Sequence, residues 1–304
     1  MRPVHRLTLL TLALPAIVGC AADRRAPGRP VRIEGSGPIL NIAVSPDGKR
    51  IAFKRYEKLY VADLASGKTT HVASITGLVA WPTWANRSGR LAVASSGGGR
   101  LDVWLVDLPN GRARNMTRGR GERHLRAVFS PDDSMLIFDA SPIHHDHEHE
   151  HEDATGIDLW LMPSQGGKAE NLTNSSKRFN RYATWSPDGK RIAFTSGRSG
   201  NREIWLMRLS DRSVRRLTDH PGWDDEPAWS PDGKYIAYVS DCGSRDSTRN
   251  IWVMKANGSQ HRQLTFSSGK RMNMNPAWDT DSSSIFFLHK TDGLIEIRRI
   301  EFRP

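Results

Sequence analysis

Hydrophobic and polar positions repeat along the chain at intervals of 40 to 56 residues. A Ser-Pro-Asp-Gly tetrapeptide at 45–48 recurs at 186–189 and 230–233, with a near copy at 130–133 and diverged copies that begin at 85 and 279. An apolar triplet such as Ile51–Ala52–Phe53 begins six residues after each start, and Trp, Phe or Val directly precedes each start. This period is typical of the four-stranded blades of a β-propeller.

Each repeat also carries further strand signals. In the fourth repeat, the run Ile204–Trp205–Leu206 is followed by a short run that ends in Leu217–Thr218. Branched and aromatic residues bounded by Gly, Pro, Asn and Asp indicate β-strands. The sixth repeat stops at 300–302 without the outer run, and an unpaired sheet edge is unfavourable. We therefore expect an all-β, six-bladed β-propeller over residues 31–304, closed by Val31–Glu34 as the missing strand.

The Ser-Pro-Asp-Gly motif is predicted to close the hairpin between the two inner strands of each blade. Proline presets φ near −65°, Asp bonds the backbone two residues on, and Gly adopts a positive φ. The aspartates are therefore interpreted as structural rather than catalytic. The Trp residues that precede the motif are expected to fill the space between blades, where large flat side chains bury the most area.

Residues 1–19 have the pattern of a lipoprotein signal peptide. Two arginines precede an apolar run over 7–18 that is short for a membrane span. The run leads into Cys20 through Ile-Val-Gly, which resembles the bacterial lipobox and implies lipidation of Cys20; the alternative is an ordinary secretory signal. Residues 20–30 then form a tether. Because Ala rather than Asp follows the cysteine, the resemblance implies an outer-membrane anchor, with the protein on the periplasmic side.

Charge and composition exclude several classes of function. The formal net charge of +11 comes from short Lys/Arg doublets spread along the chain, so we expect no nucleic-acid partner. Two cysteines in 304 residues exclude a disulfide-built scaffold. The chain contains no Walker loop, no dinucleotide fingerprint and no Gly-x-Ser-x-Gly elbow. We therefore favour a non-enzymatic, monomeric protein.

The repeats resemble a known family. The stretch PAWSPDGKYIAY at 227–238, followed by IWVM at 251–254 and QLT at 263–265, resembles the TolB-type β-propeller repeat, and the resemblance covers residues 31–304. TolB proteins carry an α/β domain before the propeller and work in the periplasm with a peptidoglycan-associated lipoprotein. Only the tether precedes the propeller here. The resemblance therefore implies a TolB-like propeller lipoprotein without that domain.

An insertion at 141–153 lengthens the third repeat and alternates histidines with carboxylates. Its five histidines are His144, His145, His147, His149 and His151. Imidazole nitrogens bind Zn²⁺, Ni²⁺ or Cu²⁺, so the tract is a candidate metal site, although no cofactor is required for the fold. A solvated low-complexity loop and a pH-responsive loop remain alternatives.

Polar residues just before the inner strands are predicted to rim the central channel, where ligands commonly dock in propellers. These are His124, Arg126, Arg181, Asp224, Asp225, Glu226, Asn273 and Asn275. Their mixed charge suits a peptide or a polar glycan.

Two hypotheses of function follow. The first is an envelope lipoprotein whose propeller is an interaction scaffold for a protein partner, with a metal-binding histidine loop. The alternative is a metal-dependent lyase or hydrolase that acts on an acidic polysaccharide, since related propellers include metal-dependent oligogalacturonate lyases. The histidines gather on one peripheral hairpin instead of the central channel, which favours the first hypothesis.

Overall fold

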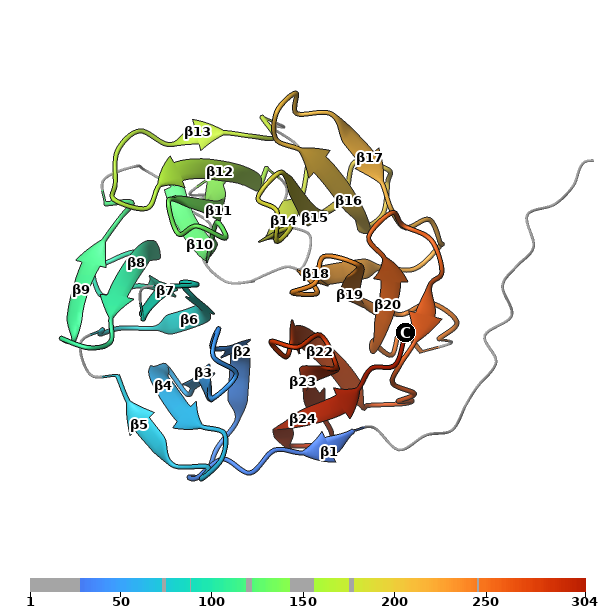
Figure 1. The fold of residues 1–304 in the computed structure, drawn as a ribbon, viewed down its shortest axis with the longest axis horizontal. Coiled ribbons are helices and arrows are strands. Elements are labelled where there is room, and N and C mark those ends of the chain that lie inside the picture. Colours follow the sequence, from blue (N-terminus) through green and yellow to red (C-terminus); the bar gives the residue numbers. More distant parts are fainter. Residues whose placement is uncertain are drawn as a thin grey trace, which may run out of the picture.

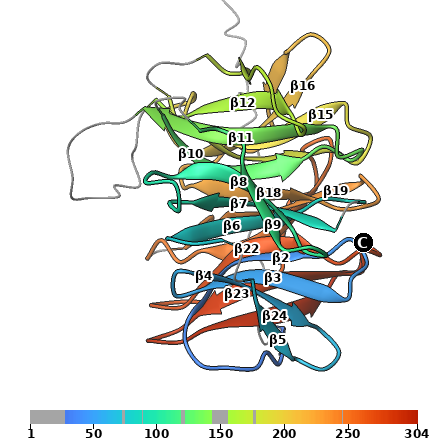
Figure 2. The same ribbon diagram turned by 90° about the vertical axis from the view of Figure 1, so that its left-hand side faces the viewer.

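The computed structural model describes residues 28–72, 75–87, 89–118, 122–142, 156–174, 178–244 and 246–304. Six four-stranded antiparallel sheets are arranged in a ring (Figure 1), and their strands run along the ring axis when the molecule is seen from the side (Figure 2). The predicted six-bladed β-propeller is confirmed. No helix in these ranges is long and apolar enough to cross a membrane.

Blades 1 to 5 use their strands in chain order from the central channel outward, whereas blade 6 takes its outermost strand from the start of the chain. Blade 1 consists of β2 (Ile39–Val44), β3 (Arg50–Arg55), β4 (Lys58–Asp63) and β5 (Thr69–His71), and blade 2 of β6 (Val79–Trp84), β7 (Arg90–Ser95), β8 (Asp102–Asp107) and β9 (Arg112–Asn115). Blade 3 consists of β10 (Glu122–Phe129), β11 (Met135–Pro142), β12 (Asp158–Pro163) and β13 (Glu170–Asn171). Blade 4 consists of β14 (Asn180–Trp185), β15 (Arg191–Ser196), β16 (Glu203–Arg208) and β17 (Val214–Arg216). Blade 5 consists of β18 (Asp224–Trp229), β19 (Tyr235–Ser240), β20 (Asn250–Lys255) and β21 (Arg262–Gln263). Blade 6 consists of β22 (Met272–Trp278), β23 (Ser284–Lys290), β24 (Ile295–Glu301) and β1 (Arg29–Pro30).

The Ser-Pro-Asp-Gly turns join the two inner strands of a blade, as predicted. In blade 1 the Ser45 hydroxyl donates to the Asp47 carboxylate and accepts from the amide of Arg50 at 2.9 Å. Gly48 has a φ of 66° and donates its amide to the Ser45 carbonyl. The hydrogen bonds that the Asp47 carboxylate accepts from the Ser45 hydroxyl and the Lys49 amide favour its charged form and lower the pKa of Asp47. The aspartate therefore serves the turn.

Blade 3 has Asp133 at the position of this glycine. Its φ is 63°, and its carboxylate accepts from the amides of Asn86 at 2.6 Å and Arg87 at 2.8 Å. An aspartate tolerates this left-handed conformation better than most residues. The departure from the motif thus adds a contact between blades 2 and 3.

The hydrophobic core lies between neighbouring sheets. The central aromatic of the second strand is almost completely buried in four blades, as Phe53, Phe138, Phe194 and Phe287. In blades 2, 4, 5 and 6 a Trp precedes the turn and packs against the preceding blade: the Trp84 indole packs among blade 1 residues and donates to the carbonyl of Ala43 at 2.9 Å. This confirms the packing role predicted for these residues.

The N-terminal segment closes the ring, although the pairing strand begins two residues earlier than predicted. Arg29 and Pro30 pair with Arg299 and Arg298 of β24. The amide of Val31 still donates to Ile297, but the amide of Glu34 already donates to Gly67 of blade 1. The segment 31–34 therefore crosses from blade 6 to blade 1 instead of forming the closing strand.

Candidate functional site: the central channel

A β-bulge interrupts every inner strand, one residue earlier in β10 than in the other five, and one side chain per blade faces the channel. The register shifts lie between residues such as Ala80 and Thr83 in β6 or Asp225 and Ala228 in β18. The residues that face the channel stand four positions before each turn motif: Asn41, Trp81, Arg126, Tyr182, Glu226 and Asn275. Five of these six have φ between 49° and 57°, a conformation that a bulge imposes on non-glycine residues.

These side chains nearly fill the axis of the ring. Together with Pro227 and Pro276 they line a cavity of about 20 Å³. A volume of this size holds about one water molecule, whereas pockets for small organic ligands have volumes of roughly 300–1,000 Å³. The described channel therefore offers no room for a sugar.

Hydrogen bonds link the channel side chains from blade to blade. Asn275 accepts from the amide of Ile42 at 2.5 Å, and Asn41 accepts from the amide of Trp81 at 3.4 Å. Glu226 accepts from the amide of Asn275 at 2.5 Å. These contacts satisfy amides that the bulges remove from the regular ladder, so the polar channel residues stabilise the ring itself.

A buried charge cluster occupies one side of the channel. Burial lowers the pKa of Arg126, while the carboxylates of Asp139 and Glu226 oppose this shift. Burial raises the pKa of Asp139 to about 6, against the opposing effects of Arg181 and Arg126. Burial also raises the pKa of Glu226, and the neighbouring Asp225 adds to the shift. Since cations and carboxylates alternate, the cluster largely neutralises itself.

The predicted rim residues separate into three groups by their place in the strand. Arg126, Glu226 and Asn275 line the channel as expected. Arg181 and Asp225 lie one residue further from the turn. There Arg181 lies 3.7 Å from Asp139 and Asp225 lies 3.3 Å from Arg202.

The placement of the remaining three on the rim is wrong. His124, Asp224 and Asn273 are at most 1% exposed, because they stand two residues further back and face the preceding blade. His124 lies 3.2 Å from Asp102, and Asn273 donates to Asn250 at 3.0 Å.

These buried residues belong to a lock that recurs between blades. The first residue of the third strand binds the outer-strand threonine of its own blade, through the pairs Asp102–Thr117, Asp158–Thr173, Glu203–Thr218 and Asn250–Thr265. The same residue also meets the inner strand of the next blade. At three interfaces it meets a residue that can donate a hydrogen bond: His124, Asn180 or Asn273.

Between blades 4 and 5 the lock brings two carboxylates together, those of Glu203 and Asp224. Burial, helped by the neighbouring Asp224 carboxylate, raises the pKa of Glu203 to about 6. His220 lies between them, with Nε2 at 2.6 Å from Asp224. Burial works to lower the pKa of His220, but Asp224 and Glu203 outweigh burial and raise it. One oxygen of Asp224 has no hydrogen-bond partner in the described chain.

Three channel residues escaped the sequence prediction: Asn41, Trp81 and Tyr182. Each stands at the same offset from its turn motif as Arg126, Glu226 and Asn275. Comparing the six repeats position by position, rather than selecting polar residues near strand starts, would have found them.

The predicted lipidation residue Cys20 and the five histidines at 144–151 lie outside the described residues. The ends of β11 and β12 confirm that the insertion joins the second and third strands of blade 3. In the part of the chain that the structure describes, no three His, Cys, Asp or Glu side chains are grouped so as to hold a metal ion.

The comparisons with known proteins agree with this architecture. The TolB beta propeller domain matches residues 28–142 and 157–303. The chain belongs to the TolB β-propeller family. Over 126 residues it is 31% identical to the Tol-Pal system protein TolB of Anaeromyxobacter dehalogenans, a match that covers 40% of this chain and 27% of that protein. The chain thus spans about a quarter of the length of the curated TolB relatives it matches.

Two solved structures show the same fold at low sequence identity. A putative TolB from Agrobacterium tumefaciens has a TM-score of 0.66 at 23% identity, over 88% of this chain and 91% of that one. An oligogalacturonate lyase in complex with manganese has a TM-score of 0.59 at 16% identity, over 89% and 78%. These likenesses concern the fold alone.

The raised pKa values of Glu203 and His220 predict how the free energy of unfolding depends on pH. The folded pKa of Glu203 and of His220 lies above the ordinary values of 4.5 and 6.5. The stabilisation from both groups is therefore complete at low pH and is lost as pH rises through their folded pKa values. Asp224→Asn supplies the donor that Asn180 supplies at the preceding interface. It should raise the free energy of unfolding at pH 8 by about 1 kcal/mol. At pH 5 it should lower the free energy of unfolding, because it removes the ion pair with protonated His220.

Urea unfolding of the full chain at pH 5 and pH 8 measures this difference. Asp211→Asn is the matched control, because this exposed turn aspartate has a lowered pKa and titrates below the range tested. An equal or larger loss of stability between pH 5 and pH 8 in Asp224→Asn than in the wild type would contradict the prediction.

Proposed function

We propose that this protein is a non-enzymatic scaffold of the cell envelope, whose rigid ring presents loops to a protein partner. The observation that carries the proposal is the match of the TolB β-propeller domain to nearly the whole described chain. The relative from Anaeromyxobacter dehalogenans, which is 31% identical over 126 residues, is named a Tol-Pal system protein. On that basis we propose that this chain, too, lies in the cell envelope and binds a protein partner.

The geometry of the channel favours docking on a face of the ring over turnover of a small substrate. The axial cavity of about 20 Å³ is too small for a monosaccharide. Its polar side chains are engaged in bonds that hold the blades together, such as that between Glu226 and Asn275. A partner would therefore contact the loops around the axis.

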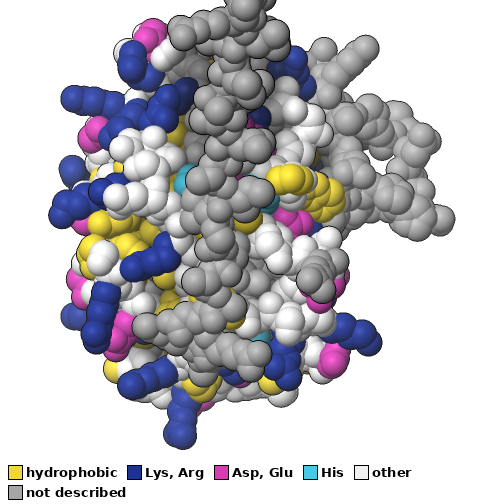
Figure 3. Space-filling view, turned by 90° about the vertical axis from the view of Figure 1, so that its right-hand side faces the viewer, with side chains coloured by type: hydrophobic (Ala, Val, Ile, Leu, Met, Phe, Trp, Pro, Cys, Tyr) yellow, Lys and Arg dark blue, Asp and Glu magenta, His cyan; other side chains and the backbone are white. Residues whose placement is uncertain are grey.

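The more suitable face is the one on which the inner strands begin, which we call the connection face. Exposed arginines stand on the loops there, among them Arg100, Arg178 and Arg271. The opposite face, the turn face, carries the Ser-Pro-Asp-Gly turns, in which aspartates balance neighbouring lysines. On the side of the molecule in Figure 3, Lys and Arg are spread among acidic and neutral groups. We infer a protein partner with an acidic surface.

Charge reversal on the two faces tests this proposal. The triple variant Arg100→Glu, Arg178→Glu and Arg271→Glu should lose an envelope protein that the wild-type full chain captures from envelope extracts, because it replaces attraction with repulsion. The matched control reverses three exposed lysines of the turn face, in Lys49→Glu, Lys190→Glu and Lys234→Glu, and should retain the partner. Quantitative mass spectrometry of the captured proteins gives the readout.

Failure of the wild-type chain to enrich any envelope protein would contradict the scaffold. Turnover of an acidic polysaccharide by the same preparation, with manganese present, would then favour the lyase alternative. Equal loss of the partner in both triple variants would retain the scaffold but contradict the choice of face.

We also propose that Cys20 carries the lipid anchor that places the ring at the outer membrane. Cys20→Ser should release the protein from membrane fractions into the soluble fraction, since one or more acyl chains supply the anchoring. Mass spectrometry of the mature wild-type protein should find a lipid-modified Cys20 at the N-terminus. An unmodified mature chain that starts elsewhere would contradict this assignment.

We further propose that the tract at 144–151 captures divalent Zn, Ni or Cu ions. Deletion of 144–151 should abolish Zn²⁺ binding in calorimetric titrations of the full chain, because it removes all five neighbouring imidazoles. Replacing only the intervening carboxylates Asp146, Glu148 and Glu150 with Gln or Asn serves as the control and should leave most of the binding. Unchanged binding after the deletion would contradict the assignment.

A further inference from the structure

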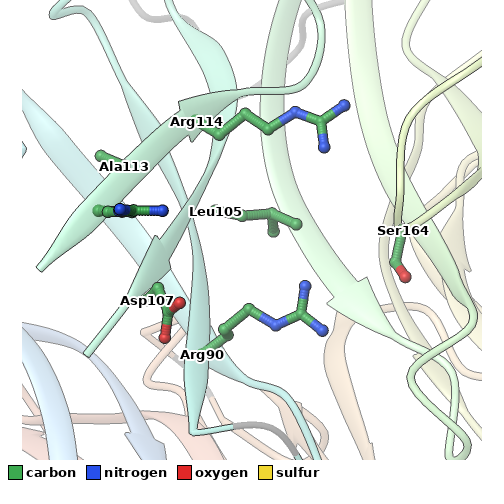
Figure 4. A pocket seen from close by; sticks show the side chains of 7 residues that line it. Arg90, Leu105, Asp107, Ala113, Arg114 and Ser164 are labelled. Carbon is green, nitrogen blue, oxygen red and sulfur yellow. The ribbon is translucent and has the colours of Figure 1, made fainter. Parts of the chain in front are cut away.

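A cleft opens at the periphery between blades 2 and 3. It has a volume of about 410 Å³ and is lined by Arg90, Leu105, Asp107, Arg112, Ala113, Arg114 and Ser164. In Figure 4 the side chains of Arg90 and Arg114 extend from blade 2 toward the segment that carries Ser164 in blade 3. The cleft is remote from the channel and takes no part in the proposed scaffold function.

This interface differs from two others in one aromatic residue. At two other interfaces the arginine equivalent to Arg90 covers the Trp of the next blade: Arg50 lies 4.8 Å from the Trp84 ring centroid, and Arg191 lies 5.2 Å from that of Trp229. Blade 3 carries Phe129 at this position. Arg90 therefore has no Trp at this position to cover.

The charge of the lining is unbalanced. Arg90, Asp107 and Arg112 form one row across β7, β8 and β9, so that one carboxylate stands between two guanidinium groups. Arg114 follows on the same face and donates to the carbonyl of Gln165 at 2.7 Å, a neutral acceptor. Three cations thus face one anion in the cleft.

We propose that this cleft binds a phosphate group. Guanidinium groups match the geometry of phosphate oxygens with paired N–H donors and form charge-assisted hydrogen bonds with them. The blade 3 segment that carries Ser164 bounds the cleft on its far side. The volume of the cleft lies within the range of small-molecule sites. The apolar side chain of Leu105 would contact the rest of the ligand. The phosphate belongs either to a small soluble molecule or to an anionic lipid headgroup.

Two measurements on the full chain test the site. Calorimetric titration with inorganic phosphate in chloride buffer should show binding, and the variant Arg112→Gln with Arg114→Gln should weaken it at least tenfold. Cosedimentation with vesicles of phosphatidylglycerol, compared with phosphatidylcholine vesicles, tests the headgroup. Comparison of variant with wild type removes any contribution of an N-terminal anchor.

The symmetry of the ring supplies a matched control. Arg215 occupies the register position of Arg114 in blade 4 and donates to the carbonyl of Asn257 in the next blade at 3.0 Å. Arg215→Gln therefore loses the same interblade bond without touching the cleft, and it should bind phosphate as the wild type does. Arg112→Gln alone leaves the Arg114 bond intact and keeps the test valid if the double variant fails to fold.

The outcomes separate cleanly. Phosphate binding that the cleft variants lose, without preference for phosphatidylglycerol, supports a soluble ligand. A vesicle preference that the same variants lose supports a lipid headgroup. Absence of both phosphate binding and vesicle preference overturns the proposal, as does equal weakening by Arg215→Gln.

Discussion

The closure of the ring is the constraint on which the rest of the structure depends. Each sheet buries its two faces against two neighbours, so a gap at any interface would expose the cores on both sides of it. Blade 6 receives its outermost strand from the start of the chain, and the hydrogen bonds of Arg29 and Val31 with β24 join the two ends. Long-range pairing of this kind costs loop entropy, which the six interblade cores offset together.

The regular ring also explains why a few irregular positions carry chemical character. Where several blades share one arrangement, as in the Ser–Asp turn hydrogen bonds of blades 1, 3, 4 and 5, the residues are structural. Where one interface differs from the others, it contains unbalanced charge or an open cleft. The facing carboxylates of Glu203 and Asp224 and the cleft beside Phe129 are two such departures. In a repeat protein, comparison between the repeats thus replaces comparison between species as a guide to function.

Local signals made the fold predictable from the sequence. Turn residues such as Gly48, the buried Phe53 and the interblade Trp84 each obey a short-range rule that recurs along the chain. The prediction placed the closing strand two residues too late, because Arg29–Pro30 is too short to show a strand pattern. His124 and Asp224 were misplaced because their burial depends on the lock with the preceding blade, and proximity to a strand start does not reveal which side a residue faces. The open cleft could not be foreseen, since it depends on how the side chains of two blades pack at one interface.

The position of β1 has a mechanical consequence. The segment that precedes Gly28 leads directly into the two residues that pair with β24, so a pulling force on the N-terminus would act first on the bonds that seal the propeller. Those bonds are few, whereas the other blades end in strands held by covalent continuity on both sides. Tension between the proposed anchor at Cys20 and a docked partner would therefore load the pairing of β1 with β24 before any interface between blades.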